Sequence, residues 1–394
     1  ARMGGTGTDY GYGIALSADG SVYTTGYFQG TVDFDPGPGV FNLTSAGSTD
    51  IFVLKLDADG NFVWAARMGG TGTDYGYGIA LSADGSVYTT GPFSGTVDFD
   101  PGPGTFNLTS AGGSDIFVSK LDADGNFVWA RRIGGTGSDF GYGIALSADG
   151  SVYTTGYFTG TADFDPGPGV FNLTSAGSED IFVLKLDAAG NFVWAARTGG
   201  AERDYGYAIS LSADGSVYTT GSFSSTADFD PRTGTFNLAS AGGHDVFVWK
   251  LLPNRAPLGV TLTPGSVLEH SPTGWPVGLL AAEDPDPGEI LSYELLDSAG
   301  GRFRLVGAQV EVDNGSLLDY RQAASHQILV RVRDILGASQ VYAVTIQVTG
   351  ASFTCSGSVW HDLNGNGVRE LGEPGIAGAV VELFQSLDAV VGNA

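Results

Sequence analysis

A repeat of 65 residues occupies residues 1–252 and constrains the fold more than any other feature of the sequence. The glycine pairs Gly4-Gly5 and Gly69-Gly70 recur at this constant spacing, and the first two copies differ at only six positions. Self-similarity at a fixed period is typical of proteins that stack one supersecondary unit after another. The copies must therefore fold alike. They span residues 1–65, 66–130, 131–195 and 196–252.

Each copy contains two β-hairpin patterns. In the first copy, apolar stretches at 13–17 and 21–26 flank an Ala-Asp-Gly turn, and stretches at 51–56 and 61–65 flank an Asp-Ala-Asp-Gly turn. Such runs, bounded by a few turn residues, are the usual signature of antiparallel hairpins. Four strands per copy predict one β-propeller blade per repeat, in an all-β chain with almost no helix. The insertion at 31–44, two short strands around a Pro-Gly turn, is expected to project from the blade.

The repeat carries a recognisable motif. The run Gly-Ile-Ala-Leu-Ser-Ala-Asp-Gly-Ser-Val-Tyr, followed by Asp-Ile-Phe-Val-Leu-Lys-Leu-Asp-Ala-Asp-Gly-Asn-Phe-Val-Trp, resembles the bacterial SBBP β-propeller repeat and, more distantly, the NHL repeat over residues 1–252. The resemblance implies that the Gly-Ile-Ala strand lines a central channel and that the Phe-Val-Trp strand is outermost. The fourth copy stops before its outermost strand, so we expect further blades, and signals for export or anchoring, outside this chain.

The charge and the cysteine content restrict the partners. The formal charge is −25 and the pI is near 4.2, which repels nucleic acid and anionic membranes and favours cations, calcium above all. Cys355 is the only cysteine, so a disulfide within the chain is impossible, and an extracellular chain needs another source of rigidity such as bound metal. No stretch approaches about 18 apolar residues, so no transmembrane segment is predicted.

A second module follows the repeats. Residues 253–349 carry alternating apolar strands typical of an antiparallel β-sandwich. The motifs Glu283-Asp284-Pro285-Asp286, Leu318-Asp319-Tyr320 and Val332-Arg333-Asp334 resemble those of a cadherin-like repeat. That resemblance implies calcium at the junction with the preceding module, held by Asp284, Asp286, Asp334 and Asn254. The alternative is that these aspartates only cap turns.

Residues 350–394 contain the truncated start of a third module. The segment from Trp360 to Gly378 resembles the opening of the B-type repeat of serine-aspartate adhesins, a β-sandwich. It also matches the calcium-loop pattern D-x-[DN]-x-[DN]-G-x5-E, in which Gly367 makes the sharp turn. A polar turn between strands is the alternative. The predicted ligands are the side chains of Asp362, Asn364, Asn366 and Glu373, the carbonyl of Val368, and Glu370 directly or through water.

Two sets of repeated side chains have alternative interpretations. Asp33 and Asp35 lie two residues apart and recur in every copy, where they either hold a cation or form a turn before Pro36. Tyr10 and Tyr12, with their copies, either offer an aromatic platform to sugars or peptides or pack between neighbouring blades.

The catalytic motifs expected of an enzyme are missing from the sequence. The four histidines are isolated, and no G-x-S-x-G, H-E-x-x-H or P-loop pattern occurs. Catalysis needs one asymmetric constellation, whereas these repeats carry nearly the same residues at equivalent places. We therefore expect a non-enzymatic, secreted or cell-surface adhesion protein with calcium-stabilised modules and a protein or carbohydrate ligand. The alternatives are a propeller-based carbohydrate-active hydrolase or lyase and a purely structural envelope spacer.

Overall fold

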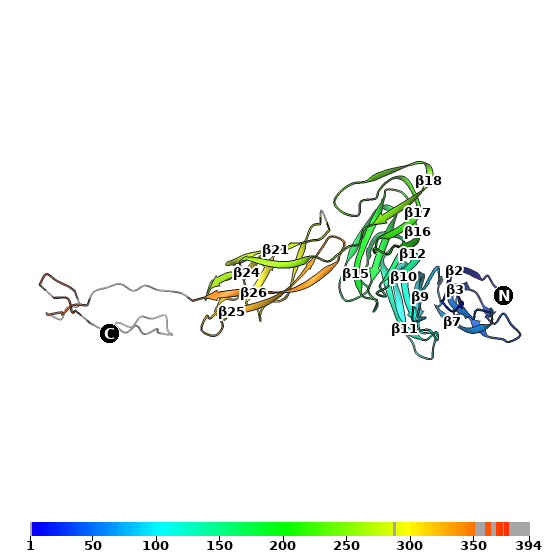
Figure 1. The fold of residues 1–394 in the computed structure, drawn as a ribbon, viewed down its shortest axis with the longest axis horizontal. Coiled ribbons are helices and arrows are strands. Elements are labelled where there is room, and N and C mark those ends of the chain that lie inside the picture. The colour runs from blue at the N-terminus through cyan, green and yellow to red at the C-terminus, as the bar shows by residue number, and fades with distance from the viewer. Residues whose placement is uncertain (1, 287–288, 351–358, 364–367, 373, 378–394) are drawn as a thin grey trace.

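The computed structural model describes residues 2–286, 289–350, 359–363, 368–372 and 374–377 of the 394-residue chain (Figure 1). These residues are almost entirely β-structure, and the one helical element among them is the short 3-10 turn Gly315–Leu317. The described part contains no helix with the length and hydropathy needed to cross a membrane. The all-β prediction is therefore confirmed.

Each sequence repeat forms its own antiparallel unit, which we number 1 to 4 in chain order. The first three units have four strands and the fourth has three, because β18 of unit 4 is followed by the linker to the next module. Unit 1 contains β2 (Tyr10–Leu16), β3 (Val22–Phe28), β6 (Asp50–Leu56) and β7 (Phe62–Gly70). Unit 2 contains β8 (Gly78–Leu81), β9 (Val87–Asp98), β10 (Asn107–Leu121) and β11 (Phe127–Gly135). Unit 3 contains β12 (Phe140–Leu146), β13 (Val152–Asp163), β14 (Asn172–Leu186) and β15 (Phe192–Gly200), and unit 4 contains β16 (Tyr205–Leu211), β17 (Val217–Asp228) and β18 (Asn237–Leu251).

The last strand of each of units 1 to 3 crosses into the next unit. Gly69 and Gly70 at the end of β7 pair with Asp98 and Val97 of β9, and the same two-residue ladder joins β11 to β13 and β15 to β17. In unit 1 itself, β1 (Gly4–Gly5) pairs in this way with β4 (Thr31–Asp33), which in turn pairs with β5 (Asn42–Thr44). The units are thereby joined into one continuous sheet.

The insertion projects less than the sequence suggests. In units 2 to 4 its two short strands are continuous with the second and third strands of the sheet, and Phe99 just beyond β9 is completely buried. The ring of Phe99 packs against those of Phe93 and Phe117, with centroids 5.5 and 5.1 Å apart. The longest exposed run of the insertion in unit 1 is its tip, residues 37–42. The insertion therefore contributes to the core at its base because its phenylalanine buries more apolar surface than a free loop would.

Residues 258–349 form two four-stranded sheets with a common core. The buried side chains of Val277, Phe303 and Val310 from one sheet share a cluster with Ile328 and Ile346 from the other. The first sheet has the order β19 (Leu258–Pro264), β21 (Pro276–Glu283), β24 (Gln309–Val312), β23 (Phe303–Val306). The second has the order β20 (Ser266–Leu268), β26 (Ser339–Thr349), β25 (Ser325–Arg333), β22 (Ser292–Asp297).

The sandwich docks on the repeats beside β15, at the end of the array away from the N-terminus (Figure 1). Contact is made by the turn between β25 and β26, where the amide of Ala195 donates a hydrogen bond of 2.9 Å to the carbonyl of Leu336. Leu336 and Ala338 are buried in the same apolar cluster as Trp194 and Trp249 of the repeats. This contact positions the residues predicted to hold calcium at the junction.

Candidate functional site at the junction of repeats and sandwich

Two of the four predicted junction ligands are brought into direct contact. The amide nitrogen of Asn254 donates a hydrogen bond of 2.9 Å to Oδ2 of Asp334. The other carboxylate oxygen of Asp334 accepts the backbone amides of Gly337 and Ala338, at 2.7 and 3.0 Å. Asp334 therefore caps the docking turn, as one of the two alternatives predicts, and also contacts the linker residue Asn254.

Arg255 neutralises a third predicted ligand. The carboxylate of Asp286 accepts hydrogen bonds from the backbone amide of Arg255 at 2.7 Å and from its guanidinium at 3.0 and 2.8 Å. Both guanidinium bonds go to Oδ1 and the backbone bond goes to Oδ2, so each carboxylate oxygen already accepts from Arg255 where a metal would bind. In this arrangement, Asp286 fits a cation less well than the other three residues. The sequence placed Arg255 directly after Asn254, but only the fold shows which carboxylate it meets.

The remaining predicted ligand, Asp284, leaves one oxygen without a hydrogen-bond partner. Within the described residues, Oδ2 of Asp284 and Oδ1 of Asn254 are both buried and unpaired. Burial, followed by the neighbouring charges of Glu289 and Asp284, raises the pKa of Asp334 to about 6. Buried oxygens that lack donors, beside a carboxyl group whose charge is disfavoured, are the chemistry that an oxygen-seeking cation such as calcium relieves. Oδ2 of Asp284 and Oδ1 of Asn254 are therefore the unpaired oxygens among the four predicted ligands.

The junction also contains an ion pair that the sequence analysis missed. Glu289 has a completely buried side chain that pairs with Arg232 of unit 4 and accepts a weak hydrogen bond from the amide of Ile335 at 3.4 Å. Arg232 occupies the position at which units 2 and 3 have Gly102 and Gly167. This difference from the other repeats was the one sequence feature that could have pointed to a special contact of Arg232. Within the described residues, no group of three or more histidine, cysteine, aspartate or glutamate side chains is placed so that it could hold a metal.

The C-terminal calcium loop lies only partly within the described structure. Asp362, Val368 and Glu370 are described, whereas Asn364, Asn366 and Glu373 lie outside the described residues. On either side of the loop, Trp360 and Gly375 form an isolated antiparallel bridge, and the amide of His361 donates to the carbonyl of Pro374 at 3.0 Å. The two ends of the predicted loop are thus held together.

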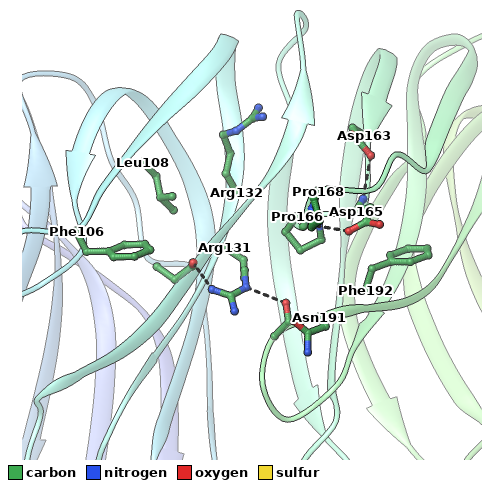
Figure 2. A pocket seen from close by; sticks show the side chains of 13 residues that line it. Phe106, Leu108, Arg131, Arg132, Asp163, Asp165, Pro166, Pro168, Asn191 and Phe192 are labelled. Carbon is green, nitrogen blue, oxygen red and sulfur yellow. Dashed lines mark hydrogen bonds between the residues drawn. The ribbon is translucent and has the colours of Figure 1, made fainter. Parts of the chain in front are cut away.

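Grooves separate the outer edges of successive units, and we number the grooves by the units that form them. Groove 2/3 is a cavity of about 490 Å³ between β11 and the insertion of unit 3 (Figure 2). Its lining includes Phe106, Arg131, Asp165, Asn191 and Phe192. Groove 1/2 is the equivalent cavity of about 300 Å³ and is lined in part by residues 64–66 and 100–103. Groove 3/4 is the place where the docking turn of the sandwich sits.

The repeated aspartates of the insertion serve as turn acceptors. Oδ1 of Asp33 accepts the amides of Asp35 and Phe41, at 3.1 and 2.8 Å, and Asp35 accepts the amide of Gly37 at 2.8 Å. The two bonds to the first aspartate recur in the other three units. These contacts account for the repeated two-residue spacing without a cation.

The repeated tyrosines contact one another across unit boundaries. The ring centroids of Tyr12 and Tyr77 are 4.8 Å apart, those of Tyr77 and Tyr142 are 5.1 Å apart, and those of Tyr142 and Tyr207 are 5.5 Å apart. Packing between units is therefore one use of these rings. Tyr12 and Tyr207, at the two ends of this row, are about half exposed.

A buried pair of aspartates lies at each boundary between units. Asp115 and Asp139 are both completely buried, and a Cβ on Gly134 would come within 2.7 Å of the first and 2.9 Å of the second. Burial is the main cause of the raised pKa of both carboxyl groups, and the charge of Asp115 adds to the effect on Asp139. The equivalent pairs are Asp50 with Asp74 and Asp180 with Asp204, and burial raises the pKa to about 7 for Asp74 and to about 6 for Asp139 and Asp204.

These buried pairs predict that the repeats lose stability as the pH rises. The folded pKa of Asp74 lies above its value of 3.8 in an unfolded chain, so between about pH 4 and pH 7 the folded state holds a proton that the unfolded state has released. Asp74→Asn should flatten the dependence of the melting temperature on pH in this window. Asp124→Asn, at an exposed position, should leave that dependence unchanged. Melting curves from pH 4.5 to 7.5 check this, and an unchanged slope in Asp74→Asn would contradict it.

The fold and the repeating units together define a class, the all-β proteins built from β-propeller repeats. Consistent with this, residues 128–165 match the family model described as SBBP, a beta-propeller repeat. Among curated proteins, an uncharacterized WD repeat-containing protein, L264, of Acanthamoeba polyphaga mimivirus is 24% identical over 256 residues, covering 56% of this chain and 18% of that protein. The regulatory protein FlaEY of Caulobacter vibrioides is 30% identical over 169 residues, covering 42% of this chain and 17% of that protein. The chain thus spans less than a fifth of either relative.

Solved cadherin structures resemble the chain only weakly. A human mucin-like protocadherin fragment, EC1-2, has a TM-score of 0.21 at 18% identity and covers 34% of this chain and 69% of its own. A chicken VE-cadherin fragment, EC1-2, has a TM-score of 0.21 at 15% identity and covers 53% of this chain and 90% of its own. Scores this low carry no argument about the sandwich.

Proposed function

We propose that this chain belongs to a non-enzymatic, secreted or cell-surface binding and adhesion protein of bacterial type. In this proposal the four units are propeller blades, residues 253–349 are a cadherin-like module and residues 350–394 begin a B-type adhesin module. The observation that supports it most is the repetition of one surface: equivalent grooves of similar composition recur between units, as in a multivalent scaffold. The ligand is a protein or a carbohydrate.

The aspartates of the repeats whose pKa is raised to about 6 or 7 are inaccessible to a substrate. A carbohydrate-active enzyme needs a carboxyl group with a raised pKa in contact with its substrate. Asp74, Asp139 and Asp204 have such pKa values, but their side chains are completely buried between units. Their repetition at each boundary is also better explained by packing than by catalysis. This favours the binding function over the hydrolase or lyase alternative.

Calcium is proposed to stiffen the modules at two places. At the junction, Asn254, Asp284 and Asp334 would provide oxygens between the repeats and the sandwich, with Asp286 joining them if Arg255 moves away. In the C-terminal loop, Asp362, Asn364, Asn366, Val368, Glu370 and Glu373 match the calcium-loop pattern. A cation in either place offsets part of the repulsion within a chain of net charge −25.

Titration calorimetry with calcium chloride tests both sites on the full-length protein. We expect two classes of site with dissociation constants of about 10⁻⁴ to 10⁻³ M, the range of extracellular modules. Asp334→Asn should remove the junction class only, and Glu373→Gln should remove most of the loop class only. A hundredfold excess of calcium over the dissociation constant should stabilise the module concerned by about 2.7 kcal/mol.

An exposed carboxylate provides the matched control. Asp313 lies on the surface of the sandwich, so Asp313→Asn should leave both classes of site intact. Absence of calcium binding up to about 10 mM, ten times the weak end of the range, would sink the calcium part of the proposal. Reproducible turnover of a glycan, abolished by one carboxylate substitution in a single unit, would overturn the binding function itself.

A further inference from the structure

One groove between units is already filled by a peptide turn from the chain itself. In groove 3/4 the turn 334–338 of the sandwich lies against β15, and its Leu336 carbonyl accepts the 2.9 Å hydrogen bond from Ala195. Leu336 is only 5% exposed and shares a cluster with Trp194 and Ala196. The contact therefore combines a backbone hydrogen bond to the outer edge of the sheet with one buried leucine.

The next residue of this turn must be glycine. Gly337 has a φ of +102°. A Cβ at this position would lie 2.8 Å from the ring of Phe192 and 2.9 Å from the ring of Phe171. These two rings pack with centroids 4.8 Å apart and form the floor on which the turn rests. The groove thus selects a tight turn of the form apolar residue, leucine, glycine, as in Ile335-Leu336-Gly337.

Groove 1/2 presents the same surface without a turn of the sandwich in it. Residues 62–67 have the sequence Phe-Val-Trp-Ala-Ala-Arg, identical to residues 192–197. Its ring pair, Phe41 with Phe62, has a centroid distance of 4.7 Å. Ala65 pairs with Leu54 in the register in which Ala195 pairs with Leu184, so its amide points out of the sheet in the same way. The ring pair and the backbone donor are reproduced, and the groove differs in that the hairpin turn of unit 2 also lines it, with the indole of Trp64 donating a 3.2 Å hydrogen bond to the carbonyl of Ala123.

Groove 2/3 differs at one position. Arg131, shown in Figure 2, replaces the alanine found at 66 and 196. Its guanidinium donates hydrogen bonds to the carbonyls of Gly190 at 2.9 Å and Ala189 at 2.8 Å. The side chain also lies over the ring of Trp129, 5.3 Å from its centroid. Arg131 therefore crosses the space next to the tryptophan, where the buried leucine of a turn would pack.

We propose that groove 1/2 binds a tight turn of a partner protein whose apex is an apolar residue, leucine and glycine, and that Arg131 excludes such a turn from groove 2/3. The ion pair of groove 3/4 is not part of the recognition, since Gly102 stands where unit 4 has Arg232. The inference rests on the proposed function as a binding scaffold and names the chemistry of its partner. It requires neither calcium nor a particular location of the protein.

A synthetic hairpin peptide tests the inference on the whole chain. The probe carries residues 331–341 of this chain, closed covalently at its ends so that the turn is preformed, and is titrated into the protein by calorimetry in the presence of a chelator. We expect one peptide per wild-type chain. Ala66→Arg should abolish binding, because it gives groove 1/2 the arginine that blocks groove 2/3. Unit 2 carries an arginine at the equivalent position 131 and still folds. Arg131→Ala should raise the stoichiometry to two.

The controls separate recognition of the turn from other effects. A peptide with Leu336→Asp should not bind, and Ala66→Arg should keep the melting temperature of the wild type. No binding up to about 1 mM peptide, or binding that persists in Ala66→Arg, overturns the inference. Self-association of the chain that Ala66→Arg prevents would also overturn it, by making a second copy the occupant. Peptide binding without calcium binding would sink only the calcium part of the proposed function, and the reverse result would sink only this inference.

Discussion

Replacing Arg132 by methionine is expected to destabilise units 2 and 3 by up to about 3 kcal/mol, below the full loss for a buried ion pair because the Arg132 side chain is 35% exposed while Asp115 is buried. Asp115 is completely buried and accepts a 2.6 Å hydrogen bond from the Arg132 guanidinium. Its other oxygen, Oδ1, has no hydrogen-bond partner within the described residues. Without the arginine, this carboxylate would keep only the amide of Ala111 and would still lie beside Asp139.

The loss of stability in Arg132→Met should depend on pH, and it should be much smaller when the ion pair is exposed. Burial already raises the pKa of Asp115, so in Arg132→Met the carboxyl group should take up a proton at mild acidity and recover part of the lost stability. Arg304, which pairs with Glu311 at 2.8 Å on the surface, provides the control, and Arg304→Met should cost less than about 1 kcal/mol. Denaturant midpoints at pH 5 and pH 7.5 measure both effects. Equal losses at the two pH values would show that the buried charge is not the cause.

Gly156→Ala is expected to be the most damaging single methyl addition in unit 3. A Cβ at this position would lie 1.8 Å from the carbonyl oxygen of Phe140 and 2.9 Å from the ring of Phe182. The obstacle is backbone of the neighbouring strand, which cannot rotate away as a side chain can. The cost should reach about 3 kcal/mol or more, the upper end for overpacked sites, with loss of the melting transition as the extreme result.

Gly11, in the first strand of unit 1, provides the comparison. At Gly11 of unit 1, an added Cβ would meet no heavy atom within 4 Å, and the backbone needs no positive φ. Gly11→Ala should therefore leave the melting temperature unchanged or slightly raised, because alanine loses less chain entropy in a strand. Thermal melting of both variants decides the matter. A similar loss in Gly11→Ala would mean that close approach to the neighbouring backbone is not the cause of the loss at Gly156.

Much of the repeat architecture could be predicted because it is local. The Ala18-Asp19-Gly20 turn fixes the first hairpin through hydrogen bonds of Asp19 to Ser21 and of Gly20 to Ser17, all within a few residues. Repetition then extends one correct local prediction to every copy. The crossing of the outer strand into the next unit was missed because a Gly-Gly pair carries no strand signal of its own.

The junction was predictable only in part, because its contacts join residues that are far apart in the sequence. Asn254 and Asp334 are far apart in sequence, and their pairing was expected only through a family resemblance. Arg255 and Arg232, which take Asp286 and Glu289 as partners, have no local motif that announces those contacts. Long side chains can reach several acids, and the fold decides among them. The same holds for Arg131, whose effect on groove 2/3 depends on a turn 58 and 59 residues away.

The strand that crosses each boundary also determines how such a protein can change its length. β7 (Phe62–Gly70) pairs with β6 of unit 1 up to Met68 and with β9 of unit 2 at Gly69 and Gly70, so the boundary between these units falls inside a strand. Because the copies are nearly identical there, recombination between them that removes or adds 65 residues rejoins the strand in register. The rejoined strand leaves the apolar cores of both neighbouring units complete. A change of length by whole units therefore keeps every strand of the array in register, whereas a change by part of a unit would not.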